Sequence, residues 1–169
     1  MTLKRAESLR KRSERQTLKN SNALSAALRL LARREHSETE LAGRLKRKGF
    51  VDADIAAALE RCRELGYMDD ARFALERTRS LMRNGRAVGH RILADLKGRG
   101  VSENDALAAL EQAALEFDGR TLLADLHRRR FPDFSYGNAD ERQRRRVVNF
   151  FLRRGFSLSQ VMSFLKEER

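Results

Sequence analysis

The chain has 169 residues, a formal net charge of +12, one cysteine and one proline, and 36% of its residues are charged. The lone Cys62 excludes a disulfide framework or a cysteine-based zinc site within one chain, and no apolar run approaches the ~20 residues that span a membrane, so we expect a cytoplasmic protein. The helix-favouring composition predicts an all-α fold, and the positive charge favours a polyanion or an acidic protein as partner over charge that serves solubility alone.

Residues 1–21 are rich in basic and polar side chains and poor in apolar ones, which predicts a flexible basic tail. Such a tail can follow a phosphate backbone or simply be solvated, and the sequence favours neither reading.

The rest of the chain shows three repeats, over residues 22–66, 67–117 and 118–169. The glycines Gly49, Gly100 and Gly155 mark them, 51 and then 55 residues apart. The same offsets from each glycine hold apolar residues, namely Leu41, Leu45, Phe50, Ile55 and Leu59; Ile92, Leu96, Val101, Ala106 and Leu110; and Val147, Phe151, Phe156, Val161 and Leu165. We expect three helices per repeat, with the small units stacked into an elongated, curved helical array.

Local signals place the helices of the first repeat and the start of the second. A capping box over Ser37–Glu40 predicts the start of one helix, and Gly49 ends it. Asp52 is expected to cap the next helix, which runs to about Leu65. In the second repeat Asp69 or Asp70 can cap the first helix.

The same signals continue to the end of the chain. The pair Asn84-Gly85 stops a helix, and Ser102–Asp105 forms a second capping box, with Asp in the place of the usual Glu. The third repeat begins near Asp118, its middle helix runs from about Ala139 to Arg154, and Ser157–Gln160 opens the last helix. Four extra residues relative to the other repeats fall in or near the segment 131–138.

We expect no catalytic residue, no metal site and no cofactor, and hence no enzyme. The three histidines, His36, His90 and His127, fall in different repeats and are expected at surface or half-buried positions. The segment Gly85–Gly89 lacks the Gly-Lys-Ser/Thr ending of a phosphate-binding loop. Cys62 lies mid-helix with no histidine in register, which argues against a nucleophile.

Basic residues gather at the ends of the chain. The net charges are +5 for residues 1–22, +2 for 23–66, zero for 67–117 and +5 for 118–169. Helix dipoles explain bases at helix C-termini, including Arg153 and Arg154, but not those near the start of the helix that follows residue 139. The candidate DNA contacts of the third repeat are Arg128, Arg129, Arg130, Arg142, Arg144, Arg145, Arg146, Arg153 and Arg154. Phe134 and Tyr136 between these runs can stack on a base or anchor the loop, and anchoring is favoured.

The segment Leu65–Ala74 (LGYMDDARFA), followed by Arg83-Asn-Gly-Arg86, Arg91-Ile92 and Leu96–Val101 (LKGRGV), resembles the RecX family of bacterial regulatory proteins. The match extends over about residues 22–168. The resemblance implies three tandem three-helix repeats and a regulator that binds the RecA recombinase filament on DNA. It also implies inhibition of the ATPase, strand-exchange and co-protease activities of RecA, and a place in DNA repair and the SOS response.

The resemblance assigns roles to six of the matched positions. Asp69, Asp70, Phe73 and Ile92 are expected to be architectural, like the turn glycines, whereas Arg86 and Arg91 are candidate partner contacts. We expect the neutral middle repeat to face protein, and the third repeat and tail to face phosphate in single- or double-stranded DNA. A monomer is expected.

The alternative is an autonomous nucleic-acid-binding protein with helix-turn-helix-like units. Acidic residues at the starts of the third and sixth helices disfavour it, because these ends would face a phosphate-lined groove.

Overall fold

The computed structural model describes residues 22–167, and all regular secondary structure in this range is α-helical. The all-α prediction is therefore confirmed for this part of the chain. The predicted basic tail over residues 1–21 lies outside the described residues. No helix in the described range is long and apolar enough to cross a membrane.

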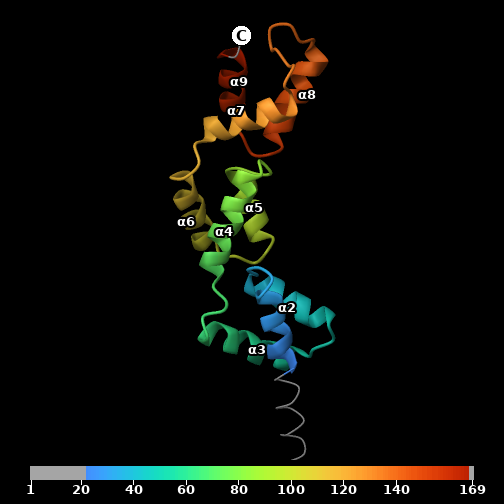
Figure 1. The fold of residues 1–169 in the computed structure, drawn as a ribbon, viewed down its shortest axis with the longest axis vertical. Helices are drawn as coiled ribbons and strands as arrows, with labels where there is room; N and C mark the ends of the chain where they lie inside the picture. The colour runs from blue at the N-terminus through green and yellow to red at the C-terminus, as the bar shows by residue number, and fades with distance from the viewer. Residues whose placement is uncertain (1–21, 168–169) are drawn as a thin grey trace, which may run out of the picture. The chain divides into compact units, whose positions relative to one another are not determined.

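The described range opens with a helical segment over residues 22–31, and further helices follow in chain order (Figure 1). They are α2 (Glu38–Arg47), α3 (Asp52–Glu64), α4 (Asp70–Arg83), α5 (His90–Lys97), α6 (Glu103–Ala114), α7 (Gly119–Arg130), α8 (Glu141–Leu152) and α9 (Leu158–Glu167).

The three repeat glycines have positive φ, and each lies between two helices. Gly49 lies between α2 and α3 with φ 87°, Gly100 between α5 and α6 with φ 78°, and Gly155 between α8 and α9 with φ 103°. In each case the amide of the following apolar residue donates to a carbonyl five residues back, as Val101 N–H does to Leu96 O at 3.2 Å. This is the Schellman ending, in which only glycine takes the left-handed conformation without strain.

Helix starts follow the predicted caps, with one exception. Ser37, Ser102 and Ser157 accept from the amide three residues on, and the Ser157–Gln160 box is complete because Ser157 N–H also donates to Gln160 Oε1. The prediction that Asp52 caps α3 is wrong. Val51 is the N-cap residue there, and its side chain makes no capping bond, so Asp52 forms the first turn instead.

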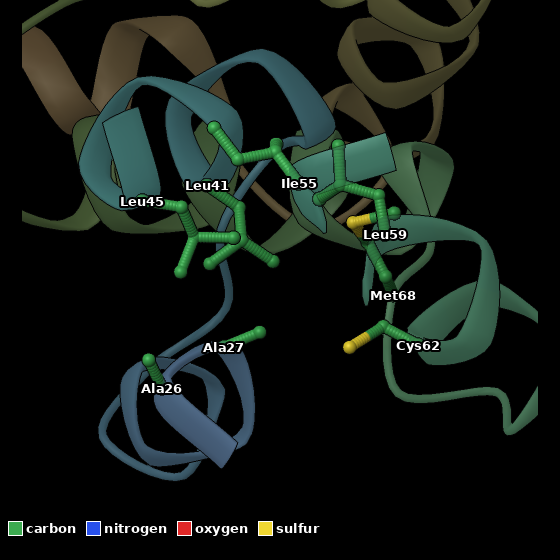
Figure 2. Packing of buried hydrophobic residues seen from close by; sticks show 8 residues of the cluster. All are labelled: Ala26, Ala27, Leu41, Leu45, Ile55, Leu59, Cys62 and Met68. Carbon is green, nitrogen blue, oxygen red and sulfur yellow. The ribbon is translucent and has the colours of Figure 1, made fainter. Parts of the chain in front are cut away.

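The chain divides into two compact units, one ending at Phe73 and the other beginning at Ala74. In the first unit α2 packs on α3. Figure 2 shows its core, in which side chains from α2, α3 and the 22–31 segment point toward one another. The cluster consists of Ala26, Ala27, Leu41, Leu45, Ile55, Leu59, Cys62 and Met68.

The second unit holds a more aromatic core. In it α5 packs on α6, and both α7 and α8 pack on α9. The cluster of buried residues is Leu123, Leu126, Val147, Phe151, Phe156, Val161, Phe164 and Leu165, with the rings of Phe131, Phe134 and Phe150 packed against it. Phe150 and Phe151 meet edge to face at 5.2 Å between ring centroids.

Two histidines differ from expectation. His36 and His127 are buried, at 2% and 6% exposed, and only His90 is exposed. The His127 ring lies among phenylalanines, 5.4 Å from Phe164 and 5.9 Å from Phe134. Its ring packs in the core like that of an aromatic residue. The three arginines that follow it in the sequence gave no indication of this burial.

Candidate functional site

The turn Gly85–Gly89 after α4 binds the end of α8 directly. Val88 N–H donates to Arg154 O at 2.8 Å, and Arg154 Nε donates to Gly85 O at 3.0 Å, across 69 residues of sequence. A Cβ on Gly155 would lie only 2.2 Å from Val88 O, so this contact requires glycine. The candidate residues Arg86 and Arg91 are exposed beside this junction, and the Cγ of Arg91 lies next to Gly155.

Arg154 belongs to the packing of the second unit. Besides its bond to Gly85, Arg154 donates through Nη1 to Phe150 O at 2.9 Å, and its guanidinium lies 3.4 Å from the centroid of the Phe150 ring. Burial, followed by the charges of Arg130 and Arg153, lowers the pKa of Arg154. Arg154, which the sequence predicted as a DNA contact, therefore has a structural role and does not belong to the proposed interface.

Arg144 holds the loop between α7 and α8. It donates to Tyr136 O at 2.9 Å and to Gly137 O at 3.1 Å, and its guanidinium lies 4.9 Å from the centroid of the Tyr136 ring. Arg144, near the start of α8, is thus bound to two carbonyls of the loop. Tyr136 is anchored by this contact, and Phe134 is anchored by its edge-to-face contact with His127.

Three more predicted contact residues have local partners. Arg145 pairs with Glu141 at 2.5 Å, and Arg128 pairs with Asp125 at the same distance. Arg129 donates to the carbonyl of Asp125 at 3.1 Å. Exposed ion pairs contribute little to stability, yet they offset the charge of Arg145 and Arg128, whereas the carbonyl bond only orients Arg129.

The other predicted contacts are exposed arginines for which the described side chains provide no ion pair. In the third repeat these are Arg130, Arg142, Arg146 and Arg153. Arg86 and Arg91 beside the junction share this property. This smaller set is the candidate interface.

Arg130 and Arg146 also share a pocket of about 570 Å³ formed by the loop between α7 and α8. The lining comprises Arg130, Phe131, Pro132, Asp133, Phe134, Ser135, Asn138, Ala139, Gln143, Arg146 and Val147. The four residues that the third repeat has in excess of the others fall in this loop, so neither other repeat has the same segment.

The architectural candidates lie at helix starts and in the cores. Asp69 accepts from Arg72 N–H at 3.0 Å at the start of α4, and Asp70 Oδ1 accepts from Glu38 N–H at 2.9 Å. Asp70 therefore joins the first turns of α4 and α2 in the first unit. Phe73 and Ile92 are buried, at 3% and 0% exposed.

Several acids and bases of the neutral middle repeat pair with one another, a set of contacts that the sequence did not reveal. The Asp95 carboxylate on α5 accepts hydrogen bonds from Arg77 Nε at 2.9 Å and Arg77 Nη2 at 3.0 Å. It also accepts one from Arg99 Nε at 2.8 Å. Hydrogen bonds, from Arg77 above all, lower the pKa of Asp95 to about 2. Arg79 Nε likewise donates to Glu116 Oε2 at 2.9 Å.

Reactive groups are few in the described part of the chain. Burial raises the pKa of the Cys62 thiol, which disfavours the thiolate. Burial, and then the charge of Arg34, lowers the pKa of His36. Residues 22–167 contain no group of three His, Cys, Asp or Glu side chains that could hold a metal ion.

Comparison with known proteins decides the family. The model of the RecX first three-helix domain matches residues 23–62. The regulatory protein RecX of Syntrophotalea carbinolica is 47% identical over 149 residues, covering 88% of this chain and 97% of that protein. The chain belongs to the RecX family.

Solved structures agree on the fold. A crystal structure of a regulatory protein RecX superposes with a TM-score of 0.72 at 24% identity, covering 89% of this chain and 74% of that one. The crystal structure of RecX from Lactobacillus salivarius gives a TM-score of 0.65 at 20% identity, covering 89% and 97%. These similarities concern the helical architecture alone.

Proposed function

We propose that this member of the RecX family is a monomeric, non-enzymatic regulator that binds the RecA recombinase filament on DNA and inhibits its ATPase, strand-exchange and co-protease activities. Family membership supports this proposal most strongly, since the most similar relatives described above are regulatory proteins. This activity assigns the protein to cytoplasmic DNA repair and to the SOS response.

The distribution of charge suggests how the contacts are divided. The middle repeat has no net charge, and several of its acids and bases pair with one another, which suits a surface that faces protein. Arg86 and Arg91 are exposed on this repeat and provide the charged contacts to the recombinase. Arg130, Arg142, Arg146 and Arg153 lack ion-pair partners among the described residues and provide the contacts to phosphate.

Titration of the DNA-dependent ATPase of RecA on single-stranded DNA tests the proposal. We expect the full-length protein to depress the ATPase at or below equimolar amounts. Addition before filament assembly should act more strongly than addition afterward if growth is blocked, and equally if formed filaments are dismantled. Binding to DNA with no change in ATPase would refute the proposal.

Arg86→Ala tests the proposed recombinase contact. Loss of one charged interface contact should raise the concentration needed for half-inhibition by about fivefold. Arg83→Ala is the matched control, because Arg83 is exposed at the end of α4 but lies outside the proposed interface. Equal effects of the two variants would remove Arg86 from the interface.

The second candidate function is autonomous binding to nucleic acid, which the unpaired arginines of the third repeat favour. Salt dependence separates the two. Six direct phosphate contacts would cost roughly 10³ in affinity between 50 and 200 mM salt, whereas a contact through the recombinase should lose less.

A further inference from the structure

The loop between α7 and α8 forms a pocket that combines cationic, apolar and amide groups. Its volume of about 570 Å³ lies within the usual range for small-molecule sites, roughly 300–1,000 Å³. The pocket lies wholly within the third repeat, and its lining comes from the end of α7, the loop and the first half of α8.

The rim carries two arginines from different elements. Arg130 is the last residue of α7 and Arg146 lies on α8, and both are exposed. Arg153 and Arg154 are close enough to Arg130 that its charge and that of Arg153 lower the pKa of Arg154. The positive charge is therefore concentrated on the Arg130 side of the pocket.

Two phenylalanines of the lining pack against other rings. Phe131 meets Phe150 edge to face at 4.9 Å, and Phe134 meets His127 in the same manner at 5.9 Å. Both phenylalanines are half-buried and line the pocket, so they present apolar surface to it. A planar ligand can lie on this surface at little entropic cost.

The walls supply oriented polar groups. In the capping box of α8, Asp140 N–H donates to the side-chain oxygen of Gln143 at 3.0 Å. This contact fixes the amide, so its NH₂ group is the remaining donor of that side chain. Ser135 and Asn138 add a hydroxyl and a second amide, and Asp133 adds one carboxylate.

We propose that this pocket binds one nucleotide of a single-stranded nucleic acid. The base lies against Phe131 and Phe134, the amide groups meet its edge, and the flanking phosphates bind Arg130 and Arg146. Base edges and sugar hydroxyls donate hydrogen bonds that Asp133 can accept, whereas a carboxylate-rich peptide would be repelled there. A duplex keeps its bases stacked inside and cannot fill the pocket.

The proposal concerns direct binding to a strand, so its test omits the recombinase and stands apart from the regulation of RecA. Fluorescence anisotropy of a labelled 15-mer of thymidine measures the affinity of the full-length protein. Arg130→Ala and Arg146→Ala should each weaken binding by about fivefold to tenfold, because each removes a charge-assisted contact to phosphate. Both residues are exposed, so neither variant should unfold the protein.

Arg145→Ala is the matched control. Arg145 is exposed next to Arg146, pairs with Glu141 and does not line the pocket, so its replacement should change the affinity less than twofold. If Arg145→Ala weakens binding as much as Arg146→Ala, the strand follows charge along α8 and the pocket assignment is overturned.

A second strand tests for the base itself. A 15-mer of abasic sites has the same phosphate charge without bases, and loss of one base–aromatic contact should weaken its binding by about tenfold. Equal affinity for the abasic and thymidine strands would overturn the proposal, as would equal affinity for a duplex. Tighter binding of a glutamate-rich peptide of equal charge would also refute it, in favour of an acidic protein segment.

Discussion

Asp95 is held between Arg77 and Arg99, and this arrangement makes stability depend on pH. The ordinary pKa of 3.8 falls to about 2 in the folded protein, so folding favours the ionised carboxylate. The stabilisation is fully present above about pH 4 and is lost as pH falls toward 2. A shift of this size corresponds to at most ~2.5 kcal/mol, and solvent screening of these partly exposed side chains reduces it to about 1 kcal/mol.

Asp95→Asn removes this contribution. At pH 7 we expect the free energy of unfolding to fall by about 1 kcal/mol, because the two arginines lose their ionised acceptor. Near pH 2 the difference should have fallen to a small fraction of its value at pH 7, because Asp95 then binds protons in the folded protein too. Urea denaturation followed by circular dichroism at both pH values measures the difference, and a gap that stays constant would show that the pair does not act through charge.

Single residues were predictable from sequence where their partners are close in the chain. The serine caps and turn glycines depend on residues within one turn, and their positions follow from local patterns. Arg154 binds Gly85, 69 residues away, and Arg144 binds loop carbonyls, so both looked like free surface charge. Burial of His127 depends on phenylalanines from three separate segments, which no local pattern reveals.

At the scale of elements, α8 carries two adjacent arginines with different structural roles. Arg144 binds the loop through Tyr136 and Gly137, and Arg145 reaches only Glu141 one turn away. We expect Arg144→Ala to lower the free energy of unfolding by about 1–2 kcal/mol, because two loop carbonyls and one aromatic face lose their partner. Arg145→Ala should change it by less than about 0.5 kcal/mol.

Chymotrypsin provides the measurement, because the loop contains Phe134 and Tyr136 as cleavage sites. Cleavage between α7 and α8 should become faster in Arg144→Ala and stay unchanged in Arg145→Ala. If both variants are cut at the rate of the parent protein, the loop is held by its phenylalanines alone and the contact with Arg144 is dispensable.

Helix boundaries were predicted well because the same start and stop signals recur. The exception, at Val51, shows the limit of this reasoning. An Asp is a good cap in general, but one residue further along it also suits the first turn of a helix, where its charge meets the positive end of the dipole. The middle helix of the third repeat, α8, is slightly shorter than predicted. Its N-cap is Asp140 and its C-cap is Arg153, so both ends lie inside the expected range from about Ala139 to Arg154.

On the scale of the whole molecule, the chain forms two compact units, and each has its own core. Leu41 is fully buried in the first unit, and Leu41→Ala should cost it about 3 kcal/mol. Hydrogen exchange followed by mass spectrometry should show lost protection in α2 and α3 while α7, α8 and α9 keep theirs. Equal loss throughout would show that the two units unfold as one.

The sequence indicated three equivalent repeats, and the apolar pattern around the glycines supported that reading. It did not indicate that the second and third groups of helices fall in one compact unit. The reason is that their junction uses backbone atoms, with Val88 N–H bound to Arg154 O and a glycine at Gly155. Neither a backbone amide, nor a glycine, nor the Arg154 side chain that binds Gly85 O identifies a distant partner in the sequence.

The junction between Gly85–Gly89 and the end of α8 joins the second and third repeats without a covalent bond, in addition to the chain that runs from α6 to α7. The link from α6 to α7 passes through Leu115, which is 89% exposed and open to a protease. A single cut there should leave two peptides that migrate as one particle in gel filtration and separate only in denaturant. The two peptides, produced apart and mixed, should likewise reassemble by complementation.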